Sequence, residues 1–251
     1  MKLSIITINL NNSIGLNKTI RSVLLQTWKD FEYIIIDGLS SDSSIEIIKK
    51  YDSSISFWST EKDNGVYDAM NKGIIVAKGE YILFLNSGDS LFSETTLAEI
   101  FSSSIESDFI FGSVAYQYPK KTIIYNVPKH LTFSYLYRSG INHQSTFTKR
   151  SIFSKYGKYD ITLKIASDWK VLILALCKYN STYVVRNTIV SLYDTQGLSA
   201  FNNGIILDEK WKILNENFPF FVKDYARYFR LDRFTFAGVS RTLHFYFQRF
   251  H

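Results

Sequence analysis

Apolar and polar residues alternate regularly through the first 90 residues of the chain. Predominantly apolar runs with the length of buried strands occupy residues 3–8, 31–36, 55–58 and 81–85. Between them, helical spacing covers residues 14–26, 45–48 and 66–77, with Ser13 expected to cap the first helix and Ser41 or Asp42 the second. Continuous apolar strands that alternate with helices are typical of a parallel sheet covered on both faces. The pattern therefore predicts an α/β fold with a mostly parallel central sheet.

The pattern changes from about residue 108. It predicts strands over 109–118, 122–127, 182–185 and 188–193, an extended segment over 142–148, and helices over 130–137, 167–178 and 202–217. The last 34 residues form a separate aromatic and basic segment, expected to be helical. We therefore expect one domain over 1–217, made of the halves 1–107 and 108–217, and a helical tail over 218–251.

Polar residues follow three of the predicted strands. In open α/β sheets ligands bind beyond the carboxyl ends of the strands, which here carry Ile8 and Asn9, Asp37, and the segment 86–89. Asp37 can bind a nucleobase or a ribose, or it can cap the next turn. Asp89 can hold a divalent cation that bridges two phosphates, although the residues alone favour a turn rich in Asn, Ser, Gly and Asp.

Three other polar positions have both a functional and a structural interpretation. Asp68 lies in the segment 61–73, where short polar side chains surround two glycines, and a capped helix start explains only part of them. Asp168 begins an apolar helix, either as its N-cap or as a general base beside a cleft. His143 lies in a polar cluster, where a structural, hydrogen-bonded histidine is more common than a metal ligand.

Composition narrows the class of protein. With 46% hydrophobic and 21% charged residues, the chain can bury a large core, which excludes long disorder. Its one cysteine, Cys177, excludes an intramolecular disulfide and a multi-cysteine metal site, and fits a reducing compartment. The apolar run at the N-terminus is too short for a signal peptide, and the longest run, 171–177, is too short for a membrane span.

These motifs together resemble the inverting family 2 glycosyltransferases of the GT-A fold, which has a Rossmann-like central sheet. The matching segments are 4–11, 25–28, 33–42, 61–73, 77–89, 142–147, 167–169 and 196–199, so the resemblance covers about residues 2–200. It points to bacterial enzymes that build O-antigen, colanic acid or capsule repeat units. The fold implied is a nucleotide-sugar-binding half over 1–107 and an acceptor-binding half over 108–217.

The resemblance also implies roles for single residues. Asp168 matches the catalytic base, and Asp89 matches the carboxylate that binds Mn²⁺ or Mg²⁺. The implied donor-binding residues are Ile8, Asn9, Asp37, Asp68, Asn86 and Ser87, and the implied acceptor-binding residues are His143, Gln144 and Trp169. Asn86 and Gly88 stand where many relatives carry Asp. The resemblance therefore implies a weaker metal dependence, and His143 is left open as a second ligand.

The implied reaction is an inverting transfer of a hexose (glucose, galactose or N-acetylhexosamine) from a UDP-sugar. The acceptor would be a hydroxyl of an undecaprenyl-diphosphate-linked oligosaccharide in lipopolysaccharide or a related polysaccharide. A sugar-phosphate nucleotidyltransferase is the alternative enzyme, but residues 9–15 hold one Gly and no Arg or Lys. A catalytically inactive membrane-associated scaffold is a further alternative. Nucleic-acid binding is disfavoured because no basic stripe precedes residue 218.

The tail concentrates both charge and aromatic residues. It holds 12 of the 41 aromatic residues and a net charge of +4 out of +6. Basic amphipathic helices with such residues lie in membrane interfaces and are attracted to anionic lipid. We therefore expect a cytoplasmic protein, peripheral on the inner face of the cytoplasmic membrane. Packing on the catalytic domain and homodimerisation are the alternatives for the same residues.

Overall fold

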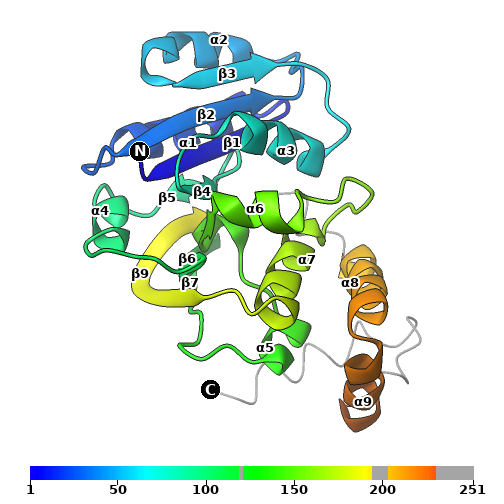
Figure 1. Cartoon of the computed structure of the whole chain (residues 1–251). Helices are drawn as coiled ribbons and strands as arrows, with labels where there is room; N and C mark the ends of the chain where they lie inside the picture. The colour runs from blue at the N-terminus through cyan, green and yellow to red at the C-terminus, as the bar shows by residue number, and fades with distance from the viewer. Residues whose placement is uncertain (119–120, 194–202, 230–251) are drawn as a thin grey trace. The chain divides into compact units, whose positions relative to one another are not determined.

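A computed structural model describes residues 1–118, 121–193 and 203–229 of the chain. It divides into two compact units, Met1–Ala200 and Phe201–His251. The first unit holds a mixed sheet with strand order β3-β2-β1-β4-β8-β6-β9-β5, in which β7 pairs with β6 (Figure 1). Its strands are β1 (Leu3–Asn9), β2 (Phe31–Asp37), β3 (Phe57–Thr60), β4 (Tyr81–Phe84), β5 (Ser90–Leu91), β6 (Phe109–Tyr118), β7 (Lys121–Tyr125), β8 (Thr146–Lys149) and β9 (Tyr183–Tyr193).

The first four strands form the predicted parallel sheet. β1 pairs in parallel with β2 and β4, and β2 pairs in parallel with β3. The pairing of β1 with β2 ends at Asn9 opposite Asp37, so the two predicted strand-end residues are neighbours. β3 begins two residues later than the apolar run at 55–58 predicted.

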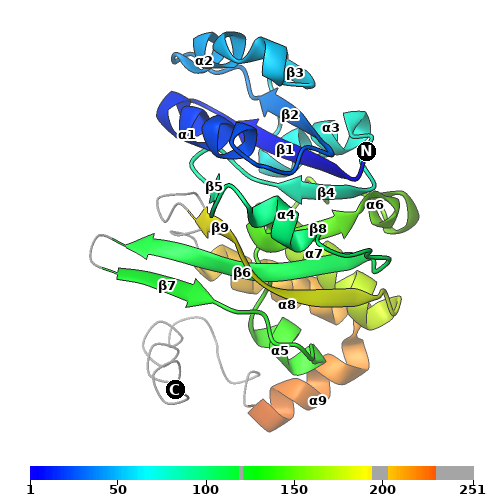
Figure 2. The same cartoon turned by 90° about the vertical axis from the view of Figure 1, so that its left-hand side faces the viewer.

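Helices cover both faces of these strands. α1 (Ser13–Leu24) and α2 (Ser44–Lys50) pack on the face that includes Leu3, Ile5 and Tyr33. α3 (Val66–Val76) packs on the opposite face, against Ile6 and Ile34 (Figure 2). Because neighbouring residues of a strand point to opposite faces, coverage on both sides explains why apolar residues occupy both faces of these strands.

The expected helix caps were partly wrong. Asn12, rather than Ser13, caps α1, and its side chain accepts a hydrogen bond from the Gly15 amide at 3.0 Å. Asp42 lies two residues before α2 and accepts hydrogen bonds from the amides of Ser44 and Ser13, at 3.0 and 2.8 Å. Asp42 therefore joins the starts of two helices, and these hydrogen bonds hold its pKa below the usual value although burial opposes the shift.

The second half of the first unit departs from the predictions in three places. β9 is one strand where two were expected, because the polar pair at 186–187 lies opposite an irregularity between Phe111 and Ser113 of β6. The segment 142–148 begins with a 3-10 turn, His143–Ser145, before it extends as β8. Three short elements were not predicted: β5, α4 (Thr96–Ile100) and α6 (Arg150–Tyr156).

The other elements follow the expected pattern. β6 and β7, both predicted as strands, form an antiparallel pair, and Pro119 and Lys120 between them lie outside the described residues. α5 (Phe133–Arg138) begins three residues later and ends one residue later than the helix expected over 130–137. α7 (Ser167–Ile173) continues as one π-helical stretch, Leu174–Lys178. The predicted helix over 167–178 is therefore helical throughout. A 3-10 turn, Asp52–Ser54, completes the described elements of this unit.

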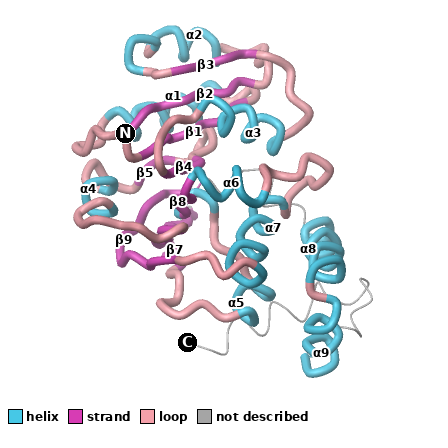
Figure 3. Tube along the Cα trace, viewed as in Figure 1, coloured by secondary structure: helices cyan, strands magenta, loops and turns pink. Residues whose placement is uncertain are grey.

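The second unit is helical in its described part. α8 (Asn203–Asn217) matches the predicted helix, and α9 (Pro219–Phe229) begins the predicted helical tail (Figure 3). Proline is common at the first position of a helix, because its missing N–H would have no partner there. No helix of the described residues is long and apolar enough to cross a membrane. Residues 230–251 lie outside the described residues, and the domain boundary at 217 stays a prediction.

Candidate active site

The carboxyl ends of β1 and β2 join with the loop after β4. The Asn9 amide donates to Asp37 Oδ1 at 2.8 Å, and its carbonyl oxygen accepts from the Ser87 hydroxyl at 2.7 Å. Three residues predicted to bind the donor are therefore in one hydrogen-bonded group. Ile8 beside them is 9% exposed and packs in the core between β1 and α3.

The Asp37 carboxylate is fully buried. Besides Asn9, it accepts hydrogen bonds from the Ser40 amide at 2.9 Å, the Ser40 hydroxyl at 2.6 Å and the Thr60 hydroxyl at 2.8 Å. Asp37 therefore caps the turn after β2, as one of its two interpretations expected. Its contact with a base or ribose stays a prediction.

The loop from Asn86 to Asp89 is fixed against α1. The Thr19 hydroxyl donates to the carbonyl of Asp89 at 2.6 Å and accepts from the Gly88 amide at 3.1 Å, and Lys18 donates to the Gly88 carbonyl at 2.9 Å. Gly88 has a φ of 105°, which a residue with a Cβ rarely adopts. The loop is thus a tight, glycine-dependent turn that buries Asp89 to 4% exposure.

Asp168 is the second residue of α7, and the cap position belongs to Ala166, so the N-cap interpretation was wrong. Asp168 Oδ1 accepts from the Tyr67 hydroxyl at 3.0 Å and from the Trp169 amide at 2.8 Å, and Oδ2 is 3.1 Å from His143 Nδ1. The side chain is 24% exposed. Burial is the largest single effect and opposes ionisation. The hydrogen bond and charge of His143, together with the Trp169 and Tyr67 donors, outweigh it and hold the Asp168 pKa below its usual value.

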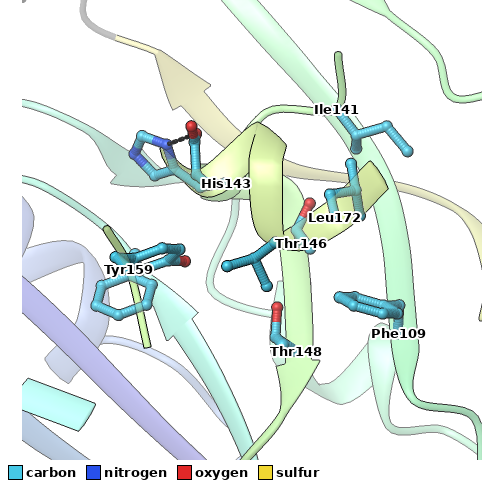
Figure 4. A pocket seen from close by; sticks show the side chains of 10 residues that line it. Phe109, Ile141, His143, Thr146, Thr148, Tyr159 and Leu172 are labelled. Carbon is cyan, nitrogen blue, oxygen red and sulfur yellow. Dashed lines mark hydrogen bonds and ion pairs between the residues drawn. The ribbon is translucent and has the colours of Figure 1, made fainter. Parts of the chain in front are cut away.

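A chain of hydrogen bonds connects the two halves of the domain. His143 Nε2 is 3.1 Å from the Asn86 amide nitrogen, and His143 Nδ1 contacts Asp168 (Figure 4). An imidazole that carries its proton on Nδ1 satisfies both contacts, since it donates to the carboxylate and accepts from the amide. The strand-end loop of the first half is thereby linked through His143 to the predicted base.

Tyr67 was not identified from the sequence. It lies in α3, is 6% exposed, and donates to Asp168 and also to the carbonyl of Ile165. Burial and the neighbouring Asp168 charge raise the Tyr67 pKa well above its usual value, so the hydroxyl stays protonated and can donate. Its only signal in the sequence was its place in the polar segment 61–73.

The other predicted residues are more peripheral to this chain of hydrogen bonds. Asp68 Oδ2 accepts from the Asn64 amide at 2.9 Å and so closes the first turn of α3. The Trp169 indole is 5% exposed and donates to the Leu136 carbonyl at 2.8 Å, and Gln144 is 4% exposed. The roles of these three residues in donor or acceptor binding stay predictions.

The donor set for a cation is sparse. Among the described residues, no group of three His, Cys, Asp or Glu side chains could hold a metal ion. Mg²⁺ and Mn²⁺ in phosphate sites need only one or two protein oxygens, because the substrate phosphates supply others. Asp89 supplies a carboxylate, and Asn86 Oδ1 is a buried oxygen without a hydrogen-bond partner. These residues fit a cation held jointly with a diphosphate, whereas both nitrogens of His143 are engaged.

A small cavity lies beside Asp168, the predicted base. It has a volume of about 20 Å³, enough for about one water molecule. Its walls include His143, Asp168, Tyr159, Thr146 and Thr148 (Figure 4). The cavity is therefore lined by polar groups of β8 and α7, next to the predicted base.

Known proteins share this architecture. The family model described as Glycosyl transferase family 2 matches residues 4–163. A PGL/p-HBAD biosynthesis glycosyltransferase of Mycobacterium bovis is 29% identical over 228 residues, which cover 84% of this chain and 83% of the relative. The poly(ribitol-phosphate) beta-N-acetylglucosaminyltransferase TarP of Staphylococcus aureus is 39% identical over 118 residues, which cover 44% of this chain and 36% of TarP.

Solved structures show the same fold. Residues 1–349 of S. aureus TarS in complex with UDP-GlcNAc match with a TM-score of 0.68 at 18% identity, covering 86% of this chain and 65% of that structure. The mannosyltransferase PcManGT from Pyrobaculum calidifontis, in complex with GDP-Man and Mn²⁺, matches with a TM-score of 0.61 at 13% identity, covering 80% of this chain and 59% of PcManGT. The GT-A fold is confirmed, and because the family model spans more than half of the sequence, this chain belongs to glycosyl transferase family 2.

Proposed function

We propose that this glycosyltransferase inverts the anomeric centre as it transfers a hexose from a UDP-sugar to a hydroxyl of a lipid-linked oligosaccharide. The observation that carries the proposal is the hydrogen-bonded group around Asp168. Its carboxylate, one quarter exposed, is held by three donors and has a lowered pKa. An ionised carboxylate fixed beside a strand-end loop is what general-base catalysis of a displacement requires.

The reaction is a single in-line displacement. The acceptor oxygen attacks the anomeric carbon as the bond from that carbon to the diphosphate oxygen breaks, and Asp168 takes the acceptor proton. His143 and Tyr67 hold the carboxylate in one orientation from opposite oxygens. Fixing the base, the acceptor and the donor in line lowers the entropic barrier of the step.

We place the donor along the strand ends of the first half. Asn9, Ser87 and the turn capped by Asp37 form a rigid wall for the nucleoside, with the diphosphate toward Asp89 and Asn86 Oδ1. A divalent cation bound there would neutralise the charge that develops on the leaving diphosphate. The crystal structures of TarS in complex with UDP-GlcNAc and with UDP support a uridine donor, and PcManGT in complex with Mn²⁺ supports the cation.

The acceptor proposal draws on the relatives and on the tail. TarP is named for transfer to poly(ribitol-phosphate), and the mycobacterial relatives for PGL/p-HBAD biosynthesis. Both support a large surface polymer or lipid as acceptor, and we favour a lipid-linked precursor of bacterial polysaccharide. The basic, aromatic tail supports a place at the inner face of the membrane, where such an acceptor lies.

A screen of nucleotide-sugars tests the proposal. Release of UDP and a rise in melting temperature, each measured with and without Mn²⁺, should identify at least one UDP-sugar as donor, and product NMR should show an inverted anomeric centre. Asp168→Asn should lower kcat about 100- to 10,000-fold without loss of folding. Asp89→Asn should abolish activation by Mn²⁺, while the exposed Asp52→Asn serves as control. Release of no nucleotide from any donor, or full activity of Asp168→Asn, would contradict the proposal.

A further inference from the structure

Four tyrosines gather on one face of the strands β7, β6 and β9. Tyr116 and Tyr118 are two residues apart on β6. Tyr125 of β7 lies opposite Val114 of β6, and Tyr193 of β9 lies opposite Tyr116. Residues two apart on a strand, and residues directly opposite on neighbouring strands, share a face. The Tyr116 ring centroid lies 4.6 Å from those of both Tyr125 and Tyr193, so the cluster is a continuous aromatic surface.

This tyrosine face is accessible from solvent. Tyr118 is 37% exposed and Tyr125 is 48% exposed, whereas the inner end of β6 is buried. Figure 2 shows β6 and β7 running side by side, and β9 also pairs with β6. The cluster is thus open at its β7 side and anchored at its β9 side.

The tyrosine face is also joined to the predicted base. The Asn142 amide donates to the Tyr116 hydroxyl at 3.0 Å, and the next residue, His143, contacts Asp168. A phenol that accepts a hydrogen bond still has its own proton to donate. Burial raises the pKa of Tyr116 to about 12 and also raises that of Tyr125, so both phenols are neutral at physiological pH.

We propose that the tyrosine face binds a sugar ring of the acceptor and guides its hydroxyl toward Asp168. A pyranose has an apolar face of C–H bonds and a rim of hydroxyls, and tyrosine offers an aromatic surface with a polar tip to match both. The face carries no acidic side chain at the positions of the three paired strands that share it, and its Tyr116 hydroxyl accepts a hydrogen bond from Asn142, the residue before His143. The inference rests on the proposed function and specifies the acceptor side of it.

Replacing Tyr125 and Tyr118 by Ala, singly, tests the proposal. Ile124→Ala is a matched control, because Ile124 is 47% exposed on the same strand but points to the other face. The probes are octyl β-glucoside, octyl β-galactoside and octyl β-N-acetylglucosaminide below their micelle concentrations, with binding measured by saturation-transfer NMR. We expect the wild type to bind at least one glycoside and each tyrosine variant to bind it about tenfold more weakly. Ile124→Ala should bind it like the wild type.

Two further measurements separate the possible failures. UDP release from the donor in the absence of acceptor should be the same in the wild type and the tyrosine variants, since the donor binds elsewhere. If the wild type binds no glycoside, or if all three variants bind equally, the tyrosine face is not the acceptor site even where donor turnover confirms the proposed function. Unchanged glycoside binding with a loss of dimers in light scattering would assign this face to self-association and overturn the proposal.

Discussion

The Asp168 carboxylate is subject to two opposite effects on its pKa, burial and hydrogen bonding. Burial raises the free energy of its charged form, while His143, Tyr67 and the Trp169 amide lower it by a larger amount. The residue types at these positions could be recognised in the sequence, but Tyr67 lies 101 positions from Asp168. No local pattern predicts a contact of that separation, so the contact between Tyr67 and Asp168 had to come from the structure.

Tyr67→Phe should move the acid limb of the kcat/KM profile to higher pH. The hydroxyl favours the charged carboxylate, so its removal raises the Asp168 pKa toward the usual value. Stability should follow the same sign: the contribution of a depressed pKa is present at neutral pH and is lost as pH falls through that pKa, so the variant should lose it at higher pH. Rates and urea unfolding measured from pH 3 to pH 8 check both.

Tyr33→Phe is the control for this variant. Tyr33 is also buried, and its hydroxyl contacts Thr7 at 3.0 Å on the other face of the sheet. Both variants should lose about 1 kcal/mol of unfolding free energy. Only Tyr67→Phe should shift the pH profile, and an equal shift in both would show that the effect is one of general stability.

Asp37→Asn should destabilise the fold strongly. The carboxylate accepts four hydrogen bonds, one from Asn9, two from Ser40 and one from Thr60. In the variant, the NH₂ group of the new side chain would face some of these donors and could not accept their hydrogen bonds. We expect a loss of about 2–3 kcal/mol in urea unfolding, because buried polar groups lose their partners. Asp52→Asn keeps an oxygen for the Trp58 indole and should change stability little. Comparable stability of the two variants would contradict this account of Asp37.

At the scale of elements, burial decides which segments the sequence reveals. β1, β2 and β4 were predicted to within one residue because both of their faces are buried and most of their positions are apolar. α4 and β5 are too short, at five and two residues, for any periodicity to appear. The cap of α1 was misplaced because Asn12 and Ser13 are both good caps, and only the hydrogen bond to Gly15 distinguishes them.

Gly79→Ala should disrupt the entry into β4. A Cβ on Gly79 would lie 2.5 Å from the backbone of Leu3 and Ser4, so β4 would have to move away from β1. The Gly79 amide also donates to the Ser4 hydroxyl at 2.9 Å. We expect a loss of about 3 kcal/mol in unfolding experiments, or failure to fold.

Gly204→Ala is the comparison for this effect. A Cβ on Gly204 meets no atom within 4 Å, and Gly204 is the second residue of α8. Alanine favours helices over glycine, so this variant should be as stable as the wild type or slightly more stable. Equal losses in both variants would show that close packing at Gly79 is not the cause.

For the whole molecule, the sequence predicted the first half of the domain, 1–107, better than the second half, 108–217. The strand ends carry Asn9, Asp37 and Ser87 to one place because parallel strands run in one direction. In the second half, β6 pairs with β7, its neighbour along the chain, but also with β8 and β9, which are distant in sequence. Such pairings leave no local signal, which is why the tyrosine face was not predicted from the same sequence.

The uneven charge of the chain leads to a prediction about membrane binding by the whole chain, 1–251. Replacing Lys223, Arg227 and Arg230 by Gln should weaken cosedimentation with vesicles of phosphatidylglycerol and phosphatidylethanolamine, because each basic residue near an anionic surface contributes about 1 kcal/mol. Replacing the exposed Lys49, Lys50 and Lys62 removes the same charge from the first unit and should leave binding unchanged. Binding of the wild type should also fall in high salt, as screening requires. If both triple variants bind the vesicles like the wild type, or if the wild type does not bind them, the tail does not bind the membrane. Packing on the catalytic domain or dimerisation would then be its role.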